Sequence, residues 1–411
     1  MESSIKYKKS FAFKGQLKNG SYEMVNVISG KSFRISAYLH DLLEFCSAWR
    51  QRETLVERML KDSLDKTQVE LTLQNLVNSK MIVSKLSDVF CELVPQHPTF
   101  FGIKCGCLYS KQHQISLIGI PFGGGNDVDA RCKDAPHTLR KATSSFFPLG
   151  IKHKKVNSSF FHQSFLRDIF YNNMEKMYDV GDVFYATGDS CVSYYDRITN
   201  VISRVVEMGN VPFCIGGDHS ITYPILKGIS TNNPSFLVLH FDAHSDLSDS
   251  DYLQVYQSSE SEMLNHATVM SFCAGLDKVK EIIQIGVREP FFVENPKCKQ
   301  ISLSEMRSEN AACQCLMERK DYVYLSFDVD FFDPSIAPGT ASKMIDGGFY
   351  EETFAFLSKI LKNKKILGID IVETNLYLDS SYMTTQLVMK LMLHLLGLIK
   401  LPVGGINLAH T

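Results

Sequence analysis

Short runs of hydrophobic residues alternate with helical patterns over most of this 411-residue chain. Six such runs lie at 115–122, 211–217, 235–241, 282–287, 322–327 and 365–372. Between them, residues 201–209 and 354–362 place hydrophobic side chains at helical spacing. Strands that are apolar along their whole length are typical of parallel sheets covered by helices on both faces. We therefore predict a three-layer α/β/α domain with a parallel sheet over residues 115–411.

The beginning of the chain follows a different pattern. Residues 25–36 alternate around a Ser-Gly-Lys turn, which predicts a β-hairpin, and helical spacing follows it. Thr67, with Glu70 three residues later, is typical of a capping box and predicts a helix that begins at Thr67. These elements predict a small winged-helix-like α+β domain over residues 1–90. Residues 91–114 contain two prolines and no clear period, so we expect a linker there.

Composition and charge narrow the class of protein. Hydrophobic residues make up 45% of the chain and charged residues 21%, which is typical of a globular protein. The net charge of -2 gives no electrostatic reason to expect a nucleic acid or a membrane as partner. The N-terminus lacks the apolar segment of a secretory signal, and the apolar stretch 387–401 is interrupted by Lys390, His394 and Lys400, which favours a core helix. With eleven cysteines expected as thiols, we predict a cytoplasmic protein.

Polar clusters follow three of the predicted strands. GGDHS occupies 216–220, DAHSD occupies 242–246, and DVDFFDP occupies 328–334. Because ligands in parallel α/β sheets bind beyond the carboxyl ends of the strands, we expect the three clusters to lie along one edge. Alternate residues of an extended chain share a face, so alternating side chains of one cluster would point the same way. The side chains that this places together are His219, Asp242, His244, Asp246, Asp328 and Asp330.

Four carboxylates at one sheet edge require positive charge. They repel each other unless some are protonated or cations compensate them. Two divalent ions would balance four carboxylates and leave the two histidines as neutral ligands. Oxygen-rich sites with some imidazole favour Mn²⁺ over Zn²⁺, and two ions about 3.5–4 Å apart can turn a shared water into hydroxide at neutral pH. A single cluster would be typical of a helix cap or a turn, but three in succession predict a site for two Mn²⁺ ions.

The same clusters carry a family resemblance. GGDHS, DAHSD and SFDVDFFDP resemble the three metal-binding signatures of the ureohydrolases, the arginase and agmatinase family. The resemblance extends over roughly 115–400 and includes GIPFGGG (119–125) and GIDIVETN (368–375). It implies an arginase-like fold and the hydrolysis of a guanidinium to urea and an amine. All six metal positions are intact, which distinguishes the chain from the histone-deacetylase relatives with a single zinc site.

The resemblance also implies catalytic roles. His266, in NHAT, matches the proton shuttle of the family, although the usual next glycine is Ala267 here. Glu373 matches the glutamate that binds the guanidinium. We place Asp246, a metal ligand, in the catalytic group with these two residues. The alternatives are a loop surface residue for His266 and a helix cap for Glu373.

Departures from the family pattern concern the substrate. Ser248 stands where free-arginine enzymes keep an asparagine, and the loop after Gly339 reads Thr-Ala-Ser-Lys where the family has Thr-Gly-Thr-Pro. We assign Ser248, Thr340 and Glu373 to substrate binding, and the departures put free arginine in doubt. The N-terminal domain resembles the PqqD-like domains of peptide-modifying enzymes, which bind the leader of a precursor peptide, typically as an added strand.

Together the two halves suggest a peptide arginase of ribosomal peptide biosynthesis, which would convert arginine residues of a precursor peptide to ornithine. One alternative is a small-molecule ureohydrolase acting on agmatine, a guanidino acid or arginine. Another is a peptide-binding protein with a degenerate catalytic domain, which the intact metal positions disfavour. The N-terminal domain could also serve in oligomerisation or as a lid, and a homo-oligomer is compatible with the sequence.

Overall fold

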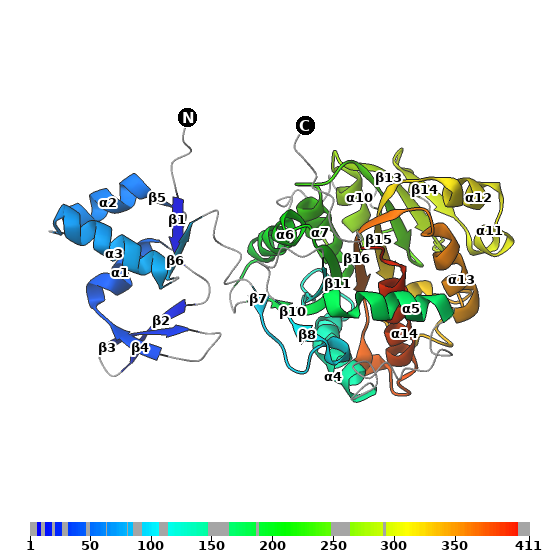
Figure 1. Ribbon diagram of the computed structural model, residues 1–411, viewed down its shortest axis with the longest axis horizontal. Helices are drawn as coiled ribbons and strands as arrows, with labels where there is room; N and C mark the ends of the chain where they lie inside the picture. Colours follow the sequence, from blue (N-terminus) through cyan, green and yellow to red (C-terminus); the bar gives the residue numbers. More distant parts are fainter. Residues whose placement is uncertain are drawn as a thin grey trace. The chain divides into compact units, whose positions relative to one another are not determined.

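The chain divides into two compact units, Met1–Val94 and Pro95–Thr411, which are described separately (Figure 1). The computed structural model describes residues 6–9, 13–18, 21–26, 32–46, 50–62, 64–79, 81–84, 93–106, 114–146, 164–185, 189–247, 264–290 and 293–401. The division lies within the segment that we predicted as a linker. Its later part belongs to the second unit, where β8 (Lys104–Cys105) pairs in parallel with β10 (Met177–Val183).

The first unit combines two small antiparallel sheets with three helices. One sheet has the order β5-β1-β6 and the other the order β2-β3-β4. The strands of these sheets are β1 Lys6–Lys9, β2 Phe13–Lys18, β3 Ser21–Asn26, β4 Ser32–Ile35, β5 Arg50–Gln51 and β6 Ile82–Ser84, and β7 (Leu93–Val94) belongs to neither sheet. The helices are α1 Ala37–Phe45, α2 Arg52–Lys61 and α3 Lys66–Asn78. A core that includes Met24, Leu43 and Met59 is fully buried within this unit.

The start of α3 differs from our prediction. The N-cap is Asp65, whose carboxylate accepts the Gln68 N–H (2.8 Å), and the Gln68 side chain in turn accepts the Asp65 N–H (3.0 Å). The capping box therefore involves Asp65 and Gln68, and our assignment of Thr67 and Glu70 was wrong. Both pairs have the same spacing, and aspartate is as good an N-cap as threonine, so the earlier pair begins the helix and Thr67 falls in its first turn.

The second unit is built on a parallel sheet. Its strands run in the order β14-β13-β12-β15-β16-β11-β9-β10, and each described neighbouring pair is parallel. They are β9 Ile115–Gly119, β11 Val211–Ile215, β12 Phe236–Phe241, β13 Val279–Ile285, β14 Cys298–Ile301, β15 Tyr322–Asp328 and β16 Lys365–Val372. Six of these strands come from the predicted apolar runs. The strand β10 was not predicted because Asp179 and Asp182 interrupt it, and both carboxylates pair with the buried Arg140 guanidinium.

Helices cover both faces of this sheet, which confirms the predicted three layers (Figure 1). One group holds α6 Cys191–Glu207, α7 Thr222–Ile229 and α10 Val269–Ala274. The other holds α4 Ala135–Phe146, α5 Ser164–Asn173, α12 Ala311–Glu318, α13 Tyr350–Ile360 and α14 Met383–Leu398, and α11 Leu303–Ser308 precedes α12. The late apolar stretch forms α14, which is buried along most of its length.

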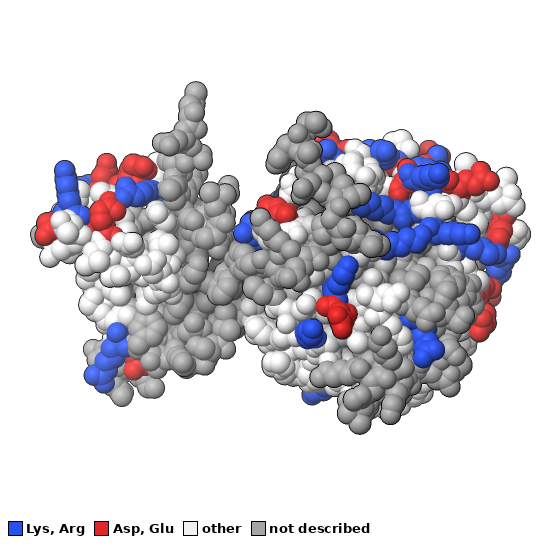
Figure 2. Space-filling model, viewed as in Figure 1, with Lys and Arg blue, Asp and Glu red and all other residues white. Residues whose placement is uncertain are grey.

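Two surface properties bear on the predicted partners. Among the described residues, no helix is both long enough and apolar enough to cross a bilayer. Lys and Arg side chains and Asp and Glu side chains both appear on the visible face of each unit (Figure 2). This mixture accords with the small net charge of the chain.

Candidate metal centre and active site

Four adjacent strands, β12, β15, β16 and β11, position the candidate site at their carboxyl ends. The three polar clusters follow β11, β12 and β15, and Glu373 follows β16 directly. The structure brings together all six side chains that we expected to hold metal, His219, Asp242, His244, Asp246, Asp328 and Asp330. The order of the strands is therefore what collects these residues from distant parts of the chain.

The local geometry differs from the alternation that we expected, because the ligand positions other than Asp328, the last residue of β15, lie in turns beyond the strands. The strand β12 ends at Phe241, and Asp246 has a left-handed backbone with a φ of 51°. The Asp242 carboxylate accepts the His244 N–H (2.6 Å), and the Asp328 carboxylate accepts the Asp330 N–H (2.9 Å). Each aspartate thus fixes the turn that carries the next ligand, so the side chains converge without an extended chain.

One cluster surrounds His219. Its Nδ1 atom lies 3.2 Å from an oxygen of Asp242, 2.8 Å from one of Asp246 and 3.3 Å from one of Asp328. His219 lies in the turn η6 (His219–Ile221), and the imidazole and all three carboxylates are almost fully shielded from solvent. Three carboxylate oxygens around a buried ring nitrogen create a strongly negative electrostatic potential.

The opposite side of the same ring is held by a buried network. His219 Nε2 lies 2.9 Å from the Ser326 hydroxyl oxygen, and that hydroxyl donates to Asp370 (2.7 Å). Tyr324 and Thr222 also donate their hydroxyl protons to the Asp370 carboxylate. Because the Ser326 proton is committed to Asp370, His219 Nε2 must carry a proton and donate it. The lone pair of the neutral ring is then on Nδ1, which has no hydrogen-bond partner among the described residues.

A second cluster surrounds His244. Its Nδ1 atom lies 3.0 Å from an oxygen of Asp330 and 3.5 Å from an oxygen of Asp242. The Asp242 oxygen in question is the one that faces away from His219, because the two imidazoles approach different oxygens of the same carboxylate. Asp242 is therefore shared, and the six side chains form two adjoining sites.

The protonation equilibria of both clusters show the same need for positive charge. Burial lowers the pKa of His219, but the three aspartates outweigh burial and raise that pKa well above its usual value. Burial likewise lowers the pKa of His244, yet Asp242 and Asp330 raise it to about 12. Burial, followed by the charge of Asp242, raises the pKa of Asp330 to about 6. The clusters take up protons when no other cation neutralises them.

The donor set fits two divalent metal ions. Each cluster offers one imidazole nitrogen and carboxylate oxygens, and Asp242 can contribute one oxygen to each site. The unpartnered Nδ1 lone pair of His219 points at three carboxylates, an arrangement that a cation between them would stabilise. Oxygen-dominated ligands with an imidazole suit Mn²⁺. The cluster is therefore compatible with the dinuclear Mn²⁺ centre that the family resemblance of the sequence implies.

His240 lies against the first cluster but turns its N–H, and not a lone pair, toward the carboxylates. Its Nε2 atom lies 2.8 Å from Asp242, while the Gln284 side-chain amide donates to its Nδ1 (3.1 Å). Since Nδ1 accepts this hydrogen bond, Nε2 carries the ring proton and donates a hydrogen bond to the carboxylate. His240 thus orients Asp242 and is not itself a ligand. The sequence signal for this role was the histidine inside the apolar run of β12, which we did not use.

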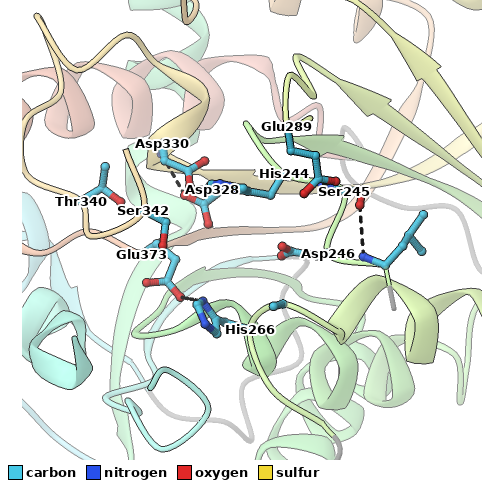
Figure 3. Close-up of a pocket in the computed structure, with 12 residues that line it drawn as sticks. His244, Ser245, Asp246, His266, Glu289, Asp328, Asp330, Thr340, Ser342 and Glu373 are labelled. Atoms are coloured by element: carbon cyan, nitrogen blue, oxygen red, sulfur yellow. Dashed lines mark hydrogen bonds and ion pairs between the residues drawn. The ribbon is translucent and has the colours of Figure 1, made fainter. Parts of the chain in front are cut away.

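A cavity of ≈ 150 Å³ opens onto the clusters (Figure 3). Its lining comprises His244, Ser245, Asp246, Leu247, His266, Ala267, Glu289, Asp328, Asp330, Thr340, Ser342 and Glu373. His266 lies beside Glu373, with 3.7 Å between its Nδ1 and a Glu373 oxygen, and its Nε2 lies 3.2 Å from Asp127. The proposed proton shuttle and the proposed guanidinium-binding carboxylate therefore share one wall of the cavity.

The backbone and the neighbours of Glu373 aim its carboxylate into this cavity. Asn126 donates its side-chain amide to one oxygen (2.7 Å), and the His219 N–H donates to the other (2.9 Å). Glu373 has a φ of 58°, a left-handed conformation that costs a non-glycine residue about 1 kcal/mol or more. Burial, followed by the charge of Asp218, raises the pKa of Glu373 well above its usual value. A cation next to this carboxylate would therefore be bound favourably.

Of the residues assigned to the substrate, Thr340 lines the cavity and Ser248 lies outside the described residues. Thr340 is buried, and its hydroxyl has no hydrogen-bond partner among the described residues. Two residues of the site were not predicted. Glu289 lies on the cavity wall and its carboxylate accepts the Ser245 N–H (2.9 Å), and Asn126 holds the Glu373 carboxylate. The only sequence signal for Asn126 is its place in the glycine-rich turn after β9.

Several known enzymes are similar in sequence to this chain. The mitochondrial agmatinase of Gallus gallus is 32% identical over 234 residues, which are 53% of this chain and 65% of that protein, slightly under two thirds of its length. The mitochondrial guanidino acid hydrolase of Homo sapiens is 29% identical over 234 residues, or 53% of this chain and 63% of that protein. The arginase of Bacillus caldovelox is 27% identical over 301 residues, covering 69% of this chain and 98% of that protein.

Solved structures share the fold. The proclavaminate amidino hydrolase of Streptomyces clavuligerus superposes with a TM-score of 0.59 at 22% identity, covering 74% of this chain and 97% of that one. The agmatine ureohydrolase of Thermoplasma volcanium gives a TM-score of 0.54 at 25% identity, covering 70% and 90%. The family profile described as the Arginase family matches residues 113–397. The chain therefore belongs to the arginase family of hydrolases, which act on the C–N bonds of guanidino groups.

Proposed function

We propose that this ureohydrolase acts on arginine residues of a ribosomally made precursor peptide, leaving ornithine in the peptide and releasing urea. The observation that carries the proposal is the joining of two units. The family profile covers residues 113–397, while residues 1–94 form a separate compact unit with its own buried core. A hairpin sheet followed by helices is the arrangement that led us to expect a peptide-recognition domain.

The catalytic unit would hold the guanidinium through Glu373. Asn126 and the His219 N–H fix the two carboxylate oxygens, so the carboxylate presents a preset face to the cavity. A guanidinium pairs well with a carboxylate because its planar N–H groups match the two oxygens. The pairing would also keep Glu373 ionised in spite of its burial.

His266 would move the proton that the reaction requires. The departing amine leaves well only when it is protonated, and a histidine is suited to deliver that proton near neutral pH. His266 lies within 3.7 Å of Glu373 and so beside the place where a bound guanidinium would lie. Divalent ions held by the two clusters would supply a hydroxide nucleophile at neutral pH.

The first unit would bind the leader of the precursor peptide. Among the described strands, β4 lies at one end of the order β2-β3-β4 and has no strand on its outer side. An extended peptide can add to such an edge through main-chain hydrogen bonds. Leader binding there would raise the effective concentration of the peptide's arginine residues for the catalytic unit of the same chain.

A small-molecule ureohydrolase is the second candidate, and Glu289 is the observation that favours it. This carboxylate lines the cavity, and among the described residues no lysine or arginine forms an ion pair with it. A substrate with a second positive charge, such as the amine of agmatine, would compensate it. The agmatinase among the relatives is consistent with this reading.

Urea release distinguishes the candidates. The full chain is assayed with Mn²⁺ on agmatine, arginine, guanidinobutyrate and arginine-containing peptides, with ornithine in the peptides detected by mass spectrometry. We expect the peptides to be preferred, and still more so when a leader is attached. Equal or greater activity on agmatine would exclude the peptide specificity, and no urea from any substrate would exclude the enzymatic function.

A further inference from the structure

The four most exposed large hydrophobic side chains of the second unit, among its described residues, lie outside the cavity lining, in loops that are bonded or joined to site residues. Their exposed fractions are 77% for Ile345, 64% for Tyr382, 63% for Val128 and 61% for Tyr377. We call these four residues the pocket rim. Single exposed hydrophobic residues are common, but a group of them around one opening is typical of a binding surface.

Val128 and Tyr377 lie on the Glu373 side of the cavity. Asn126, which holds the Glu373 carboxylate, also accepts the Val128 N–H with its side-chain oxygen (2.8 Å). Tyr377 lies in the turn η8 (Leu376–Leu378), shortly after Glu373. The guanidinium carbon of Arg131 lies 5.5 Å from the centre of its ring, so the loop after β9 approaches this tyrosine.

Ile345 and Tyr382 flank the loop that contributes Thr340 and Ser342 to the lining. Arg288, the neighbour of the lining residue Glu289, donates to the Ile345 carbonyl (2.9 Å) and so holds this end of the loop against the cavity wall. Tyr382 lies two residues before Thr384, whose hydroxyl accepts the Gly339 N–H (2.7 Å). The pocket rim therefore borders both the loop after β16 and the loop that carries Thr340 and Ser342.

The conformation of Tyr382 indicates that its exposure is not incidental. Its φ of 57° is in the left-handed region, where a bulky residue is destabilised by about 1–2 kcal/mol. Burial of the side chain does not offset this cost, because Tyr382 is 64% exposed. Strained positions of this kind concentrate at sites of function.

We propose that the pocket rim binds the residues that flank the arginine of a polypeptide substrate. The proposal rests on the peptide substrate proposed above. The occupant follows from continuity with the cavity, because its carboxylates take the guanidinium and the rim then meets whatever carries that guanidinium. Free agmatine and free arginine end in charged groups, which gain nothing from exposed hydrophobic surface. Apolar neighbours of an arginine in a peptide would bury surface there.

The test compares two short peptides, identical except that leucine or serine residues flank the internal arginine, together with agmatine. The protein is the full Mn²⁺-loaded chain and its double variant Ile345→Asn/Tyr382→Asn. Asparagine tolerates the left-handed backbone of position 382, so the fold is preserved. We expect kcat/KM for the leucine peptide to fall by about tenfold, as loss of buried apolar area implies, while the serine peptide and agmatine change by less than about twofold.

A matched control is Tyr322→Asn, an exposed tyrosine at the opposite end of β15 from the site. It should leave the ratio of the two peptides unchanged. Equal losses for all substrates in the double variant would overturn the proposal, because the two residues would then shape the catalytic pocket or the fold. An unchanged leucine-to-serine ratio would overturn it as well.

Three further outcomes bear on the pocket rim and on the proposed function. If light scattering shows that the double variant loses a dimer or higher oligomer that the parent forms, the rim is an interface between copies of the chain and the proposal is wrong. If the parent releases urea from agmatine but from no peptide, the rim proposal fails with the peptide substrate while the ureohydrolase activity stands. If no substrate yields urea, the proposed function itself fails.

Discussion

His219 and His244 hold equivalent places in the two halves of the metal cluster but differ in how they are fixed. The His219 ring is buried, and its Nε2 atom is held by Ser326 and, through it, by Asp370. The His244 side chain is 26% exposed and lines the cavity. Both imidazoles approach Asp242, each on its own oxygen. The two rings therefore differ in support and in exposure, and His219 faces three carboxylates where His244 faces two.

This comparison predicts two unequal ions. A ring whose tautomer and orientation are fixed in advance loses less freedom when it binds metal. The His219 site should therefore bind its ion more tightly, and the His244 site should exchange its ion with solvent through the cavity. The predictions below test that difference, in order of decreasing effect.

Asp242→Asn should have the largest effect because the carboxylate serves both halves. Neither site keeps its shared anionic ligand, so we expect less than one Mn²⁺ per chain and a fall in kcat of about 10⁴-fold, the result of losing several kcal/mol of stabilisation. Metal content after gel filtration and urea release measure the two quantities. Retention of two ions by this variant would show that Asp242 is not shared.

His219→Ala and His244→Ala should separate the two halves. Each variant should retain about one ion and lose activity by about 10³-fold. The remaining ion should be tight in His244→Ala and weak in His219→Ala, as measured by calorimetric titration with Mn²⁺. Equal affinities for the remaining ion in the two variants would contradict the asymmetry.

Ser326→Ala removes the hydroxyl that supports the His219 ring but leaves all six ligand side chains unchanged. Loss of the hydroxyl should weaken the tighter Mn²⁺ by about 10–100-fold and leave the weaker ion unchanged. Tyr324→Phe is the matched control, because it removes a hydroxyl that donates to Asp370 but does not contact His219. The same loss in both variants would mean that the network acts only through general stability, which thermal unfolding of the metal-free proteins would reveal.

The pH dependence of Mn²⁺ stabilisation should be the smallest effect. In the metal-free protein the pKa of Asp330 is raised to about 6 and that of His244 to about 12. Between the ordinary pKa of each group and its raised value, the folded state binds more protons than the unfolded state, so metal-free stability falls as pH rises. Metal ions compete with these protons. The increase in Tm caused by Mn²⁺ should therefore grow from pH 5 to pH 8, and a constant or shrinking increase would contradict the assignment.

The sequence predicted the sheet and the ligand types but not the support of the ligands. Apolar runs and the polar residues after them are local signals, so β12, β15 and the six ligand positions could be located directly. The bond between Asn126 and Glu373 joins residues 247 positions apart, and no local pattern indicates it. Asp370 was inside a predicted strand, where a carboxylate in an apolar run is a sign of a buried hydrogen-bond network. The left-handed backbone of Glu373 could not be anticipated, because glutamate rarely adopts it, and aspartate adopts it more often but at too few positions to single out Asp246.

The order of the four site strands has a consequence for synthesis of the protein. The strand β16 lies between β11 and β15 in the sheet but is the last of the four to leave the ribosome. His219 and Glu373, whose backbone and side chain are bonded to each other, are 154 residues apart. A growing chain that has released the first three clusters still lacks the strand that brings His219 beside the others. The nascent polypeptide therefore cannot assemble the complete centre until nearly all of the second unit has been translated.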